Sequence, residues 1–241
     1  TSWDTYIFSS FMFDTKDSSL FIDNFMRYFK NKKTLVKPYN YGWHSEVVIL
    51  DTKLKAKAIP LYALGRTFSE HILIMPDKKT IYLYDNKNSF LYLLILDKQA
   101  DFSKGVLYVS SANQNQIKWH KLGKHSALRF KMKLKKKLNF KQIFKYKKPI
   151  NDKCPKGYGL SDTMFGQECL KVLKKFKKYA SGFESIRYAS LKGASKWGYD
   201  ISGFYFDKKN KSINFKIRNN KKEIKFDVGF DKNLSSYFIL K

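Results

Sequence analysis

The sequence predicts a mainly β protein, an antiparallel meander with two helical insertions in a single domain over residues 1–241. Short apolar or alternating runs are separated by turn residues about every 8–12 positions, which is typical of a sandwich, barrel or propeller. A hydrophobic content of 43% allows a substantial core and excludes a wholly disordered chain. The longest apolar run, Phe90–Leu96, has the length of a strand and is far shorter than the roughly 18 residues of a membrane span.

Two elements are expected before the meander. Residues Thr1–Phe8 alternate as a strand does, and Asp17–Ser19 then offers N-caps for a helix. The apolar residues of this helix share one face, as core-packing stripes do. They are Phe21, Ile22, Phe25, Met26 and Phe29.

Seven strands with short connections follow. They are Ser45–Leu50, Ala58–Ala63, His71–Met75, Thr80–Tyr84, Phe90–Leu96, Val106–Ser110 and Ile117–Lys121. The connections contain the turn formers Asp, Asn and Pro, as in Pro76–Lys79, Asp85–Asn88 and Asn113–Asn115. Because parallel pairing needs a crossover of a dozen residues or more, these strands must pair antiparallel.

The second half contains the two helical insertions and then returns to β character. Lys131–Lys148 holds nine lysines between apolar residues. Such a segment could lie on an anionic membrane surface or bind nucleic acid, or it could be a solvated loop or a helix with one buried face. A helix is expected over Gly166–Ala180, with Leu170, Val172, Leu173 and Phe176 facing inward. The last expected strands are Ile201–Phe206, Ser212–Ile217, Glu223–Val228 and Ser236–Leu240, with hairpin connections at Asp207–Asn210 and Asn219–Lys221.

The net charge of +28 is extreme, and a field of that sign attracts phosphates, nucleic acid or an anionic envelope surface. A second explanation is compositional, since Lys, Asn, Phe, Ile and Tyr are the residues that an AT-rich genome favours. Arginine, the better bidentate phosphate reader, supplies few of the 48 basic residues, so the charge is expected to be diffuse.

Two cysteines leave the redox compartment open. Cys154 and Cys169 could form one disulfide that closes a short loop, as in an exported protein, or remain two buried thiols. Two cysteines are too few to predict a metal finger.

Oxygen-rich residues at strand ends are the candidate chemical groups. Glu70, Asp85 with Asn86, and Glu184 could ligate a hard cation such as Ca²⁺, although an Asp-Asn pair is most often only a turn. No helix carries a His-Glu-x-x-His pattern, and no glycine-rich loop or Gly-x-Ser-x-Gly elbow occurs. The four histidines show no ligand spacing and are expected to be surface or core imidazoles: His44, His71, His120 and His125.

Several short sequence segments resemble motifs of the PhoX-type alkaline phosphatases, and they occur in the same order. The most specific is Ala63–Arg66 followed by Glu70, which is similar to the family's Ala-Leu-Gly-Arg-Phe-x-His-Glu. The continuous likeness covers Thr1 to about Leu122, and Phe183–Ile186 resembles the family's Arg-Pro-Glu-Gly-Ile. The other phrases are Thr1–Tyr6, Tyr41–Val47, Tyr82–Tyr92 and Gly105–Val109 with Trp119.

This resemblance implies a partial or degenerate β-propeller with a calcium and iron centre that hydrolyses phosphate monoesters in the periplasm or after export. Carried over by position, Glu70, Asp85 and Glu184 would ligate metal, and Arg66 and Asn86 would bind substrate. Residues 1–122 would be the propeller blades, 123–180 a basic insertion with a helix, and 181–241 further C-terminal strands.

The chain departs from the family pattern at several of these positions. The family's Cys-Glu-Glu is Ser9–Phe11 here, the His before Glu70 is Ser69, the second Asp is Asn86, and the Arg-Pro is Gly182-Phe183. Serine is a poor replacement for an iron-binding thiolate, and several anionic ligands are absent. We therefore expect the metal site to be impaired or lost.

The expected function is that of a PhoX-like metal-dependent phosphomonoester hydrolase family member with this reduced site. The alternative is a non-catalytic basic propeller-type module that binds phosphate-rich ligands, nucleic acid or an envelope surface. The chain begins at Thr1 without a signal peptide, so either a leader has been removed or it is part of a longer protein. Family members are longer, which fits a split, truncated or decayed one. The oligomeric state stays open.

Overall fold

The computed structural model describes residues 6–9, 12, 14–17, 37–50, 55–113, 116–136, 138–218, 223–227 and 235–240. The expected N-terminal strand is described from β1 (Tyr6–Ser9) onward. The helix expected around Phe21–Phe29 lies outside the described residues, as does the connection at Asn219–Lys221.

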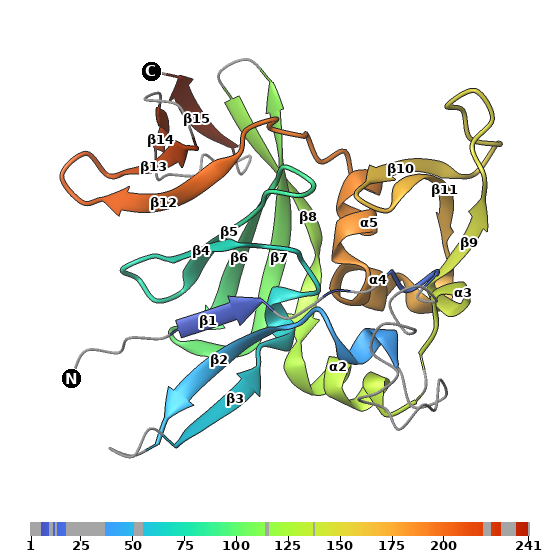
Figure 1. Ribbon diagram of the computed structural model, residues 1–241, viewed down its shortest axis with the longest axis horizontal. Coiled ribbons are helices and arrows are strands. Elements are labelled where there is room, and N and C mark those ends of the chain that lie inside the picture. Colours follow the sequence, from blue (N-terminus) through green and yellow to red (C-terminus); the bar gives the residue numbers. More distant parts are fainter. Residues whose placement is uncertain are drawn as a thin grey trace.

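A nine-stranded antiparallel sheet is the largest part of the fold (Figure 1). Its strands run in the order β12-β13-β14-β15-β8-β7-β6-β5-β4, so β4 to β8 form a meander and β15 pairs with β8. The expected mainly β, antiparallel meander is therefore confirmed, while the described strands form neither a closed barrel nor a propeller. The strands are β4 (His71–Ile74), β5 (Thr80–Asp85), β6 (Phe90–Lys98), β7 (Asp101–Asn113), β8 (Gln116–Ser126), β12 (Ile201–Asp207), β13 (Ser212–Ile217), β14 (Glu223–Asp227) and β15 (Ser235–Leu240).

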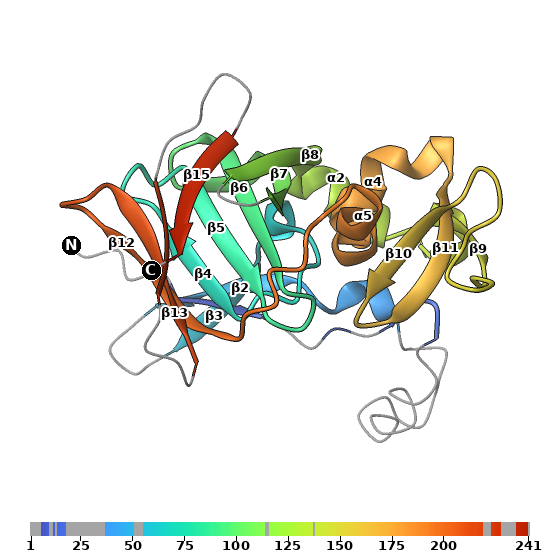
Figure 2. The ribbon, with the colours of Figure 1, turned by 90° about the horizontal axis from the view of Figure 1, so that it is seen from above.

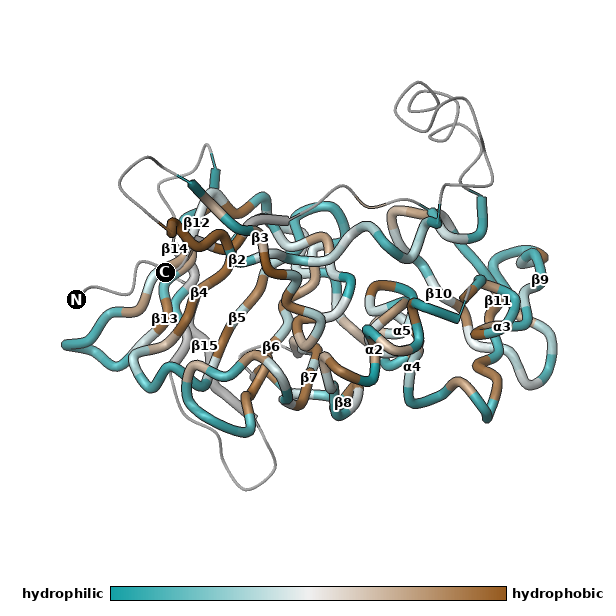
Figure 3. Tube along the Cα trace, turned by 90° about the horizontal axis from the view of Figure 1, so that it is seen from below, coloured by the Kyte–Doolittle hydropathy of each residue, from teal (hydrophilic) through white to brown (hydrophobic). Residues whose placement is uncertain are grey.

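Turn chemistry and apolar content explain the meander locally. In the β4–β5 turn the Asp77 carboxylate accepts hydrogen bonds from the backbone N–H groups of Lys79 and Thr80, each at 2.8 Å. This is the Asx geometry that favours aspartate in turns. Hydrophobic residues concentrate along β4 to β8 and hydrophilic ones in the hairpin turns (Figure 3).

Two smaller three-stranded sheets flank the large one. The first has the order β1-β2-β3, with β2 (His44–Ile49) and β3 (Ala56–Pro60). The second has the order β10-β11-β9, with β9 (Phe144–Lys147), β10 (Gly159–Thr163) and β11 (Gly166–Val172). None of the strands of this second sheet was predicted.

The prediction of a helix over Gly166–Ala180 is wrong for the first half of that range. That half is β11, which pairs with β10 on one side and β9 on the other, and only Lys177–Phe183 (α4) is α-helical. A disulfide joins Cys169 of β11 to Cys154. Pairing on both edges satisfies the backbone of β11, and this tertiary context overrides its helix propensity.

Helices fill the space between the large sheet and the β9–β11 sheet (Figures 1 and 2). In the basic segment Lys131–Lys148, Phe140, Ile143 and Phe144 are buried while nearly all the described lysines are exposed. The segment therefore has one buried face, as one of the interpretations expected. The helices are α2 (Ala127–Leu134), α3 (Phe140–Ile143), α4 and α5 (Ser185–Leu191), with 3₁₀ turns η3 (Pro38–Asn40), η4 (Tyr62–Leu64) and η5 (Lys174–Phe176).

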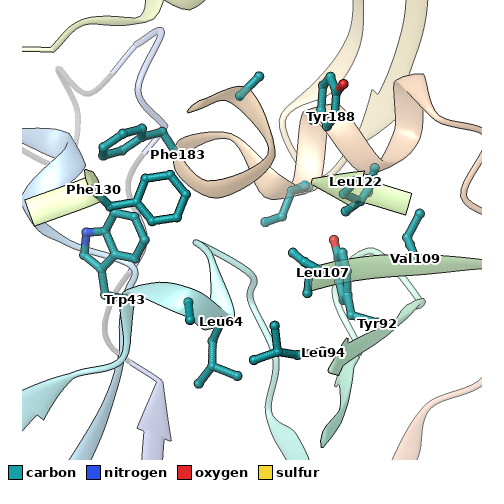
Figure 4. Packing of buried hydrophobic residues seen from close by; sticks show 14 of the residues in the cluster. Trp43, Leu64, Tyr92, Leu94, Leu107, Val109, Leu122, Phe130, Phe183 and Tyr188 are labelled. Carbon is teal, nitrogen blue, oxygen red and sulfur yellow. The ribbon is translucent and has the colours of Figure 1, made fainter. Parts of the chain in front are cut away.

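An aromatic cluster joins α2 and α4 to the chain before β2 (Figure 4). The ring of Phe183 lies 5.5 Å from Trp43 and 5.3 Å from Phe130, both in edge-to-face geometry. A Cβ at Gly182 would lie 2.2 Å from the Phe130 ring. Only glycine therefore lets α4 approach α2 this closely.

Candidate functional site

The structure buries Arg66. The loop that carries it needs Gly65, whose φ of +73° is a conformation that residues with a Cβ rarely adopt. The Arg66 guanidinium donates to the carbonyl oxygens of Tyr41 and Phe183, each at 2.7 Å, and lies over the Tyr39 ring. With 2% of its surface exposed, Arg66 ties together η3 and the end of α4, and its expected role in substrate binding stays a prediction.

Glu184 lies close to Arg66, between α4 and α5. Its carboxylate accepts hydrogen bonds from the Tyr39 hydroxyl at 2.6 Å, from Nη1 of Arg187 at 3.1 Å and from the Thr15 hydroxyl. Burial, together with the charge of Glu184, raises the pKa of Tyr39 and keeps its hydroxyl a donor. Glu184 is 4% exposed and already neutralised by a cation of the chain itself.

Arg187 is the centre of a buried ion network that the sequence did not reveal. Its guanidinium contacts three carboxylates: Glu168 at 2.5 Å, Asp14 at 2.8 Å and Glu184 at 3.1 Å. The Phe165 ring lies 4.2 Å away on its face. Burial acts against the charge of Arg187, but Glu184 and Glu168 outweigh it and raise its pKa. Here a guanidinium holds carboxylates together as a metal ion would.

Glu70, Asp85 and Asn86 lie together at a second place, where β4 begins and β5 ends. The Nδ2 group of Asn86 donates to Glu70 at 2.9 Å and to the carbonyl of Ile201 at 2.9 Å, and its Oδ1 accepts from the Ile201 N–H at 3.0 Å. His71 approaches the same carbonyl at 2.7 Å through Nε2. Glu70 is exposed.

Asp85 points into its own turn. Its carboxylate accepts from the N–H of Asn88 at 3.0 Å and from Nδ2 of Asn88 at 2.7 Å. Burial raises its pKa to about 7, although these hydrogen bonds oppose the shift. The side chain is fully buried, which fits the interpretation of the Asp-Asn pair as a turn.

The three expected metal ligands are not gathered around one point. Among the described residues, no group of three or more His, Cys, Asp or Glu side chains could hold a metal ion. Glu70 and Asp85 lie where β4 begins and β5 ends, whereas Glu184 belongs to the Arg187 network. A mixed calcium and iron centre does not fit this arrangement.

Two of the four histidines are core imidazoles. His44 contacts the Thr67 hydroxyl at 2.8 Å, and His125 contacts the Ala63 carbonyl at 2.8 Å through Nδ1 and the Ser181 hydroxyl at 3.0 Å through Nε2. Burial lowers the pKa of His44 and of His125 to about 4, so both are neutral at pH 7.

A lysine cluster on η5 and α4 is the clearest anion-attracting surface of the described chain. It consists of Lys174, Lys175, Lys177 and Lys178, which surround a hollow of about 440 Å³ with Leu122 and Tyr188. Among the described residues none of the four pairs with a carboxylate. The composition predicts a diffuse charge, but these four lysines lie within five consecutive residues, and the fold adds Leu122 of β8 and Tyr188 of α5 to their hollow.

The lysine cluster extends onto α2. Lys133 lies 4.5 Å from the centre of the Phe176 ring. Its pKa is lowered by partial burial and by the positive charges of Lys136 and Lys175. The charges of Lys136 and Lys175 therefore add to the effect of burial on Lys133.

Comparisons of the chain with protein-family models, with curated proteins and with solved structures found no match. None of the described helices is long and apolar enough to cross a membrane.

Proposed function

We propose that this protein is a diverged, non-catalytic relative of the PhoX-type phosphatases that binds phosphate-rich ligands through its lysine cluster. The observation that carries the proposal is the hollow bounded by Lys174, Lys175, Lys177 and Lys178 without an acidic partner among the described residues. Four ammonium groups around one hollow attract several phosphates at once, and the net charge of +28 adds long-range attraction.

The Arg187 network supports the non-catalytic part of the proposal. Glu184 would have to leave Arg187 and Tyr39 to bind a metal ion, which would break the buried network and leave Arg187 with only Glu168 and Asp14. We also propose that β4 to β7 are what remains of one propeller blade, since blades are four-stranded antiparallel sheets.

The Cys154–Cys169 disulfide supports a periplasmic or exported location, where disulfides persist.

Titration with inorganic polyphosphate at a series of salt concentrations tests the proposal. Replacing all four cluster lysines by alanine should weaken binding strongly and reduce the salt slope of log K by about three, near 0.7 for each phosphate that is no longer neutralised. The matched control replaces four exposed lysines of the large sheet and its turns: Lys87, Lys104, Lys208 and Lys209. Equal losses of affinity in both variants would show that the charge is diffuse and would overturn the lysine cluster as the site.

Two further titrations distinguish between the possible sources of the phosphates. The same titration is run with single-stranded oligothymidine and with vesicles that contain anionic phospholipid. Nucleic acid or an envelope surface becomes the ligand if its affinity exceeds that of polyphosphate at equal salt and depends on the same lysine cluster.

Phosphomonoester hydrolysis is the second candidate function, favoured by the position of Glu70. This carboxylate is exposed, lines a cavity of about 980 Å³ and lies near the buried Asp85. Calcium and iron are the metals that the resemblance implies. Metal analysis and a chromogenic phosphate ester test this candidate: turnover that requires bound metal and is lost in Glu70→Gln would support it, and absence of both metal and turnover would end it.

A further inference from the structure

The nine-stranded sheet curls so that its two edge strands face each other. Strands β4 and β12 end the sheet on opposite sides, yet both lie on the same side of the molecule (Figure 1). Asn86 and His71 connect them through Ile201 by side-chain hydrogen bonds. Beyond Ile201 no described backbone pairing joins the two strands, so a seam runs between them.

A cavity of about 980 Å³ lies along this seam, and we call it the seam cavity. Ile72 and Ile74 of β4 line it together with Gly203 and Phe204 of β12. Ile7 of β1 also contributes, and β1 is an edge of the smaller β1–β3 sheet. Three strands that each end a sheet therefore border one cavity whose volume lies in the range of ligand sites.

The outer backbone groups of β4 face away from β5. The N–H of Met75 donates to the carbonyl of Thr80 at 2.9 Å, which places Met75 opposite Thr80 in a hydrogen-bonded pair. Because such pairs alternate in an antiparallel ladder, Leu73 also bonds to β5, while the N–H and C=O groups of Ile72 and Ile74 point to the open edge. These groups are the template onto which a further strand pairs.

Strand β12 leaves room for a close approach of backbone. Its register with β13 shifts between Ile201 and Gly203. A Cβ built on Gly203 would meet no atom within 4 Å. A glycine beside open space in a strand is typical of a place where another backbone comes near.

The charge of the seam cavity is opposite to that of the chain. Glu46 and Glu70 line it, and neither forms a salt bridge within the part of the chain that the structure describes. Lys78 lies in the β4–β5 turn at the other end of β4. In a protein of net charge +28, two such carboxylates select a ligand that carries a positive group.

We propose that the seam cavity binds an extended segment of a partner protein as an added strand on β4, with a lysine or arginine of that segment directed to Glu46 and Glu70. Backbone hydrogen bonds to Ile72 and Ile74 supply affinity, and the apolar lining accepts alternate side chains of the segment. The inference uses none of the lysines of the proposed phosphate site, so either can hold without the other.

Fluorescence polarisation with a labelled peptide tests the proposal on the full chain. The probe is an acetylated hexapeptide of alternating valine and threonine with one central lysine. Its first control has the same side chains but is N-methylated at alternate amides, which removes the strand-pairing donors. Because several hydrogen bonds are removed, we expect binding at least about tenfold weaker for this control. Its second control carries glutamate in place of lysine and should also bind at least about fivefold more weakly.

Protein variants and hydrogen exchange locate the peptide. The double variant Glu46→Gln with Glu70→Gln should bind the lysine probe about fivefold more weakly and lose the preference for lysine over glutamate. The matched control, Asp152→Asn with Asp162→Asn in the β9–β11 part of the chain, should bind as the unchanged protein does. The amides of Ile72 and Ile74 should exchange more slowly when the probe is bound. No binding at millimolar probe, equal binding of the N-methylated peptide, or unchanged exchange at Ile72 and Ile74 would each overturn the proposal.

Discussion

The side-chain amide of Asn86 makes the two hydrogen bonds to the backbone of Ile201 that a paired strand would make. Nδ2 donates to the Ile201 carbonyl at 2.9 Å, and Oδ1 accepts from the Ile201 N–H at 3.0 Å. A primary amide can do this because it presents one donor and one acceptor as a peptide group does. This single side chain connects the β5–β6 turn to β12, whose position in the sequence is more than a hundred residues later.

Replacing Asn86 by alanine should loosen β12. The substitution leaves the N–H and C=O groups of Ile201 without these partners, and we expect a loss of about 1–3 kcal/mol in the free energy of unfolding. Urea denaturation measures this loss, and hydrogen exchange at the Ile201 amide should become faster. The control is Asn210→Ala, because the Asn210 side chain bonds Asp207 in an exposed turn and should contribute less. Equal effects of the two substitutions would contradict a special role for Asn86.

The β4–β8 meander could be predicted because its information is local. Each hairpin from β4 to β8 has its own turn formers and its own alternating strands, so neighbouring residues suffice to define the meander. The Asn86–Ile201 contact was not predicted because it depends on how the whole sheet curls. The curvature of a sheet cannot be inferred from the pattern of neighbouring residues. The four lysines of the cluster are neighbours in the sequence, but their hollow was not predicted because β8 supplies one wall of it and helices supply the others.

Strand β11 shows where local patterns mislead. Leu170, Val172, Leu173 and Phe176 have helical spacing, but Cys169 is fixed by its disulfide and both edges of β11 are paired. The candidate site residues were assigned from sequence segments that resemble family motifs. For Glu70, Asp85 and Asn86 these segments belong to neighbouring strands, and the three residues do lie together. The segments could not show that Glu184 belongs to a different cluster, because Arg187 and Glu168 meet only in the folded chain.

Replacing Arg187 by methionine should destabilise the protein strongly. Glu184 would stay buried without its cation and Glu168 would keep only Lys16, and loss of one partner of a buried ion network costs about 3–5 kcal/mol. Urea denaturation is the measurement. Arg218→Met is the matched control, because Arg218 pairs with Asp200 on the surface, and exposed pairs contribute about 0–1 kcal/mol.

A second substitution keeps this prediction testable if Arg187→Met alone does not fold. Adding Glu168→Gln removes one of the stranded charges, so the double variant should recover part of the lost stability. A double variant that is less stable than Arg187→Met would contradict the charge-network explanation.

Asp85 should make the stability of the protein depend on pH. Burial raises its pKa in the folded protein to about 7, whereas its ordinary value is 3.8. Between about pH 4 and pH 7 the folded state therefore binds more protons than the unfolded state, and stability falls as the pH rises through this range. The slope from this one group is at most about 1.4 kcal/mol per pH unit, and it ends above pH 7.

The variant Asp85→Asn isolates this contribution. Its stability relative to the unchanged protein should rise between about pH 4 and pH 7, whatever the substitution costs through the hydrogen bonds to Asn88. Urea denaturation at a series of pH values measures the difference. Parallel curves for the two proteins would show that Asp85 is ionised in the folded state across this range.

Reduction of the Cys154–Cys169 disulfide should destabilise the β9–β11 sheet. The two cysteines are separated by 15 residues, and closing a loop of this size limits the unfolded chain enough to stabilise the folded state by about 3 kcal/mol. We expect dithiothreitol to lower the thermal midpoint of the unchanged protein. The double variant Cys154→Ala with Cys169→Ala should have a lower midpoint that dithiothreitol does not change. If mass spectrometry shows free thiols in the untreated protein, or if complete reduction leaves its midpoint unchanged, the disulfide does not stabilise this fold, and the support that it gives to an exported location is lost.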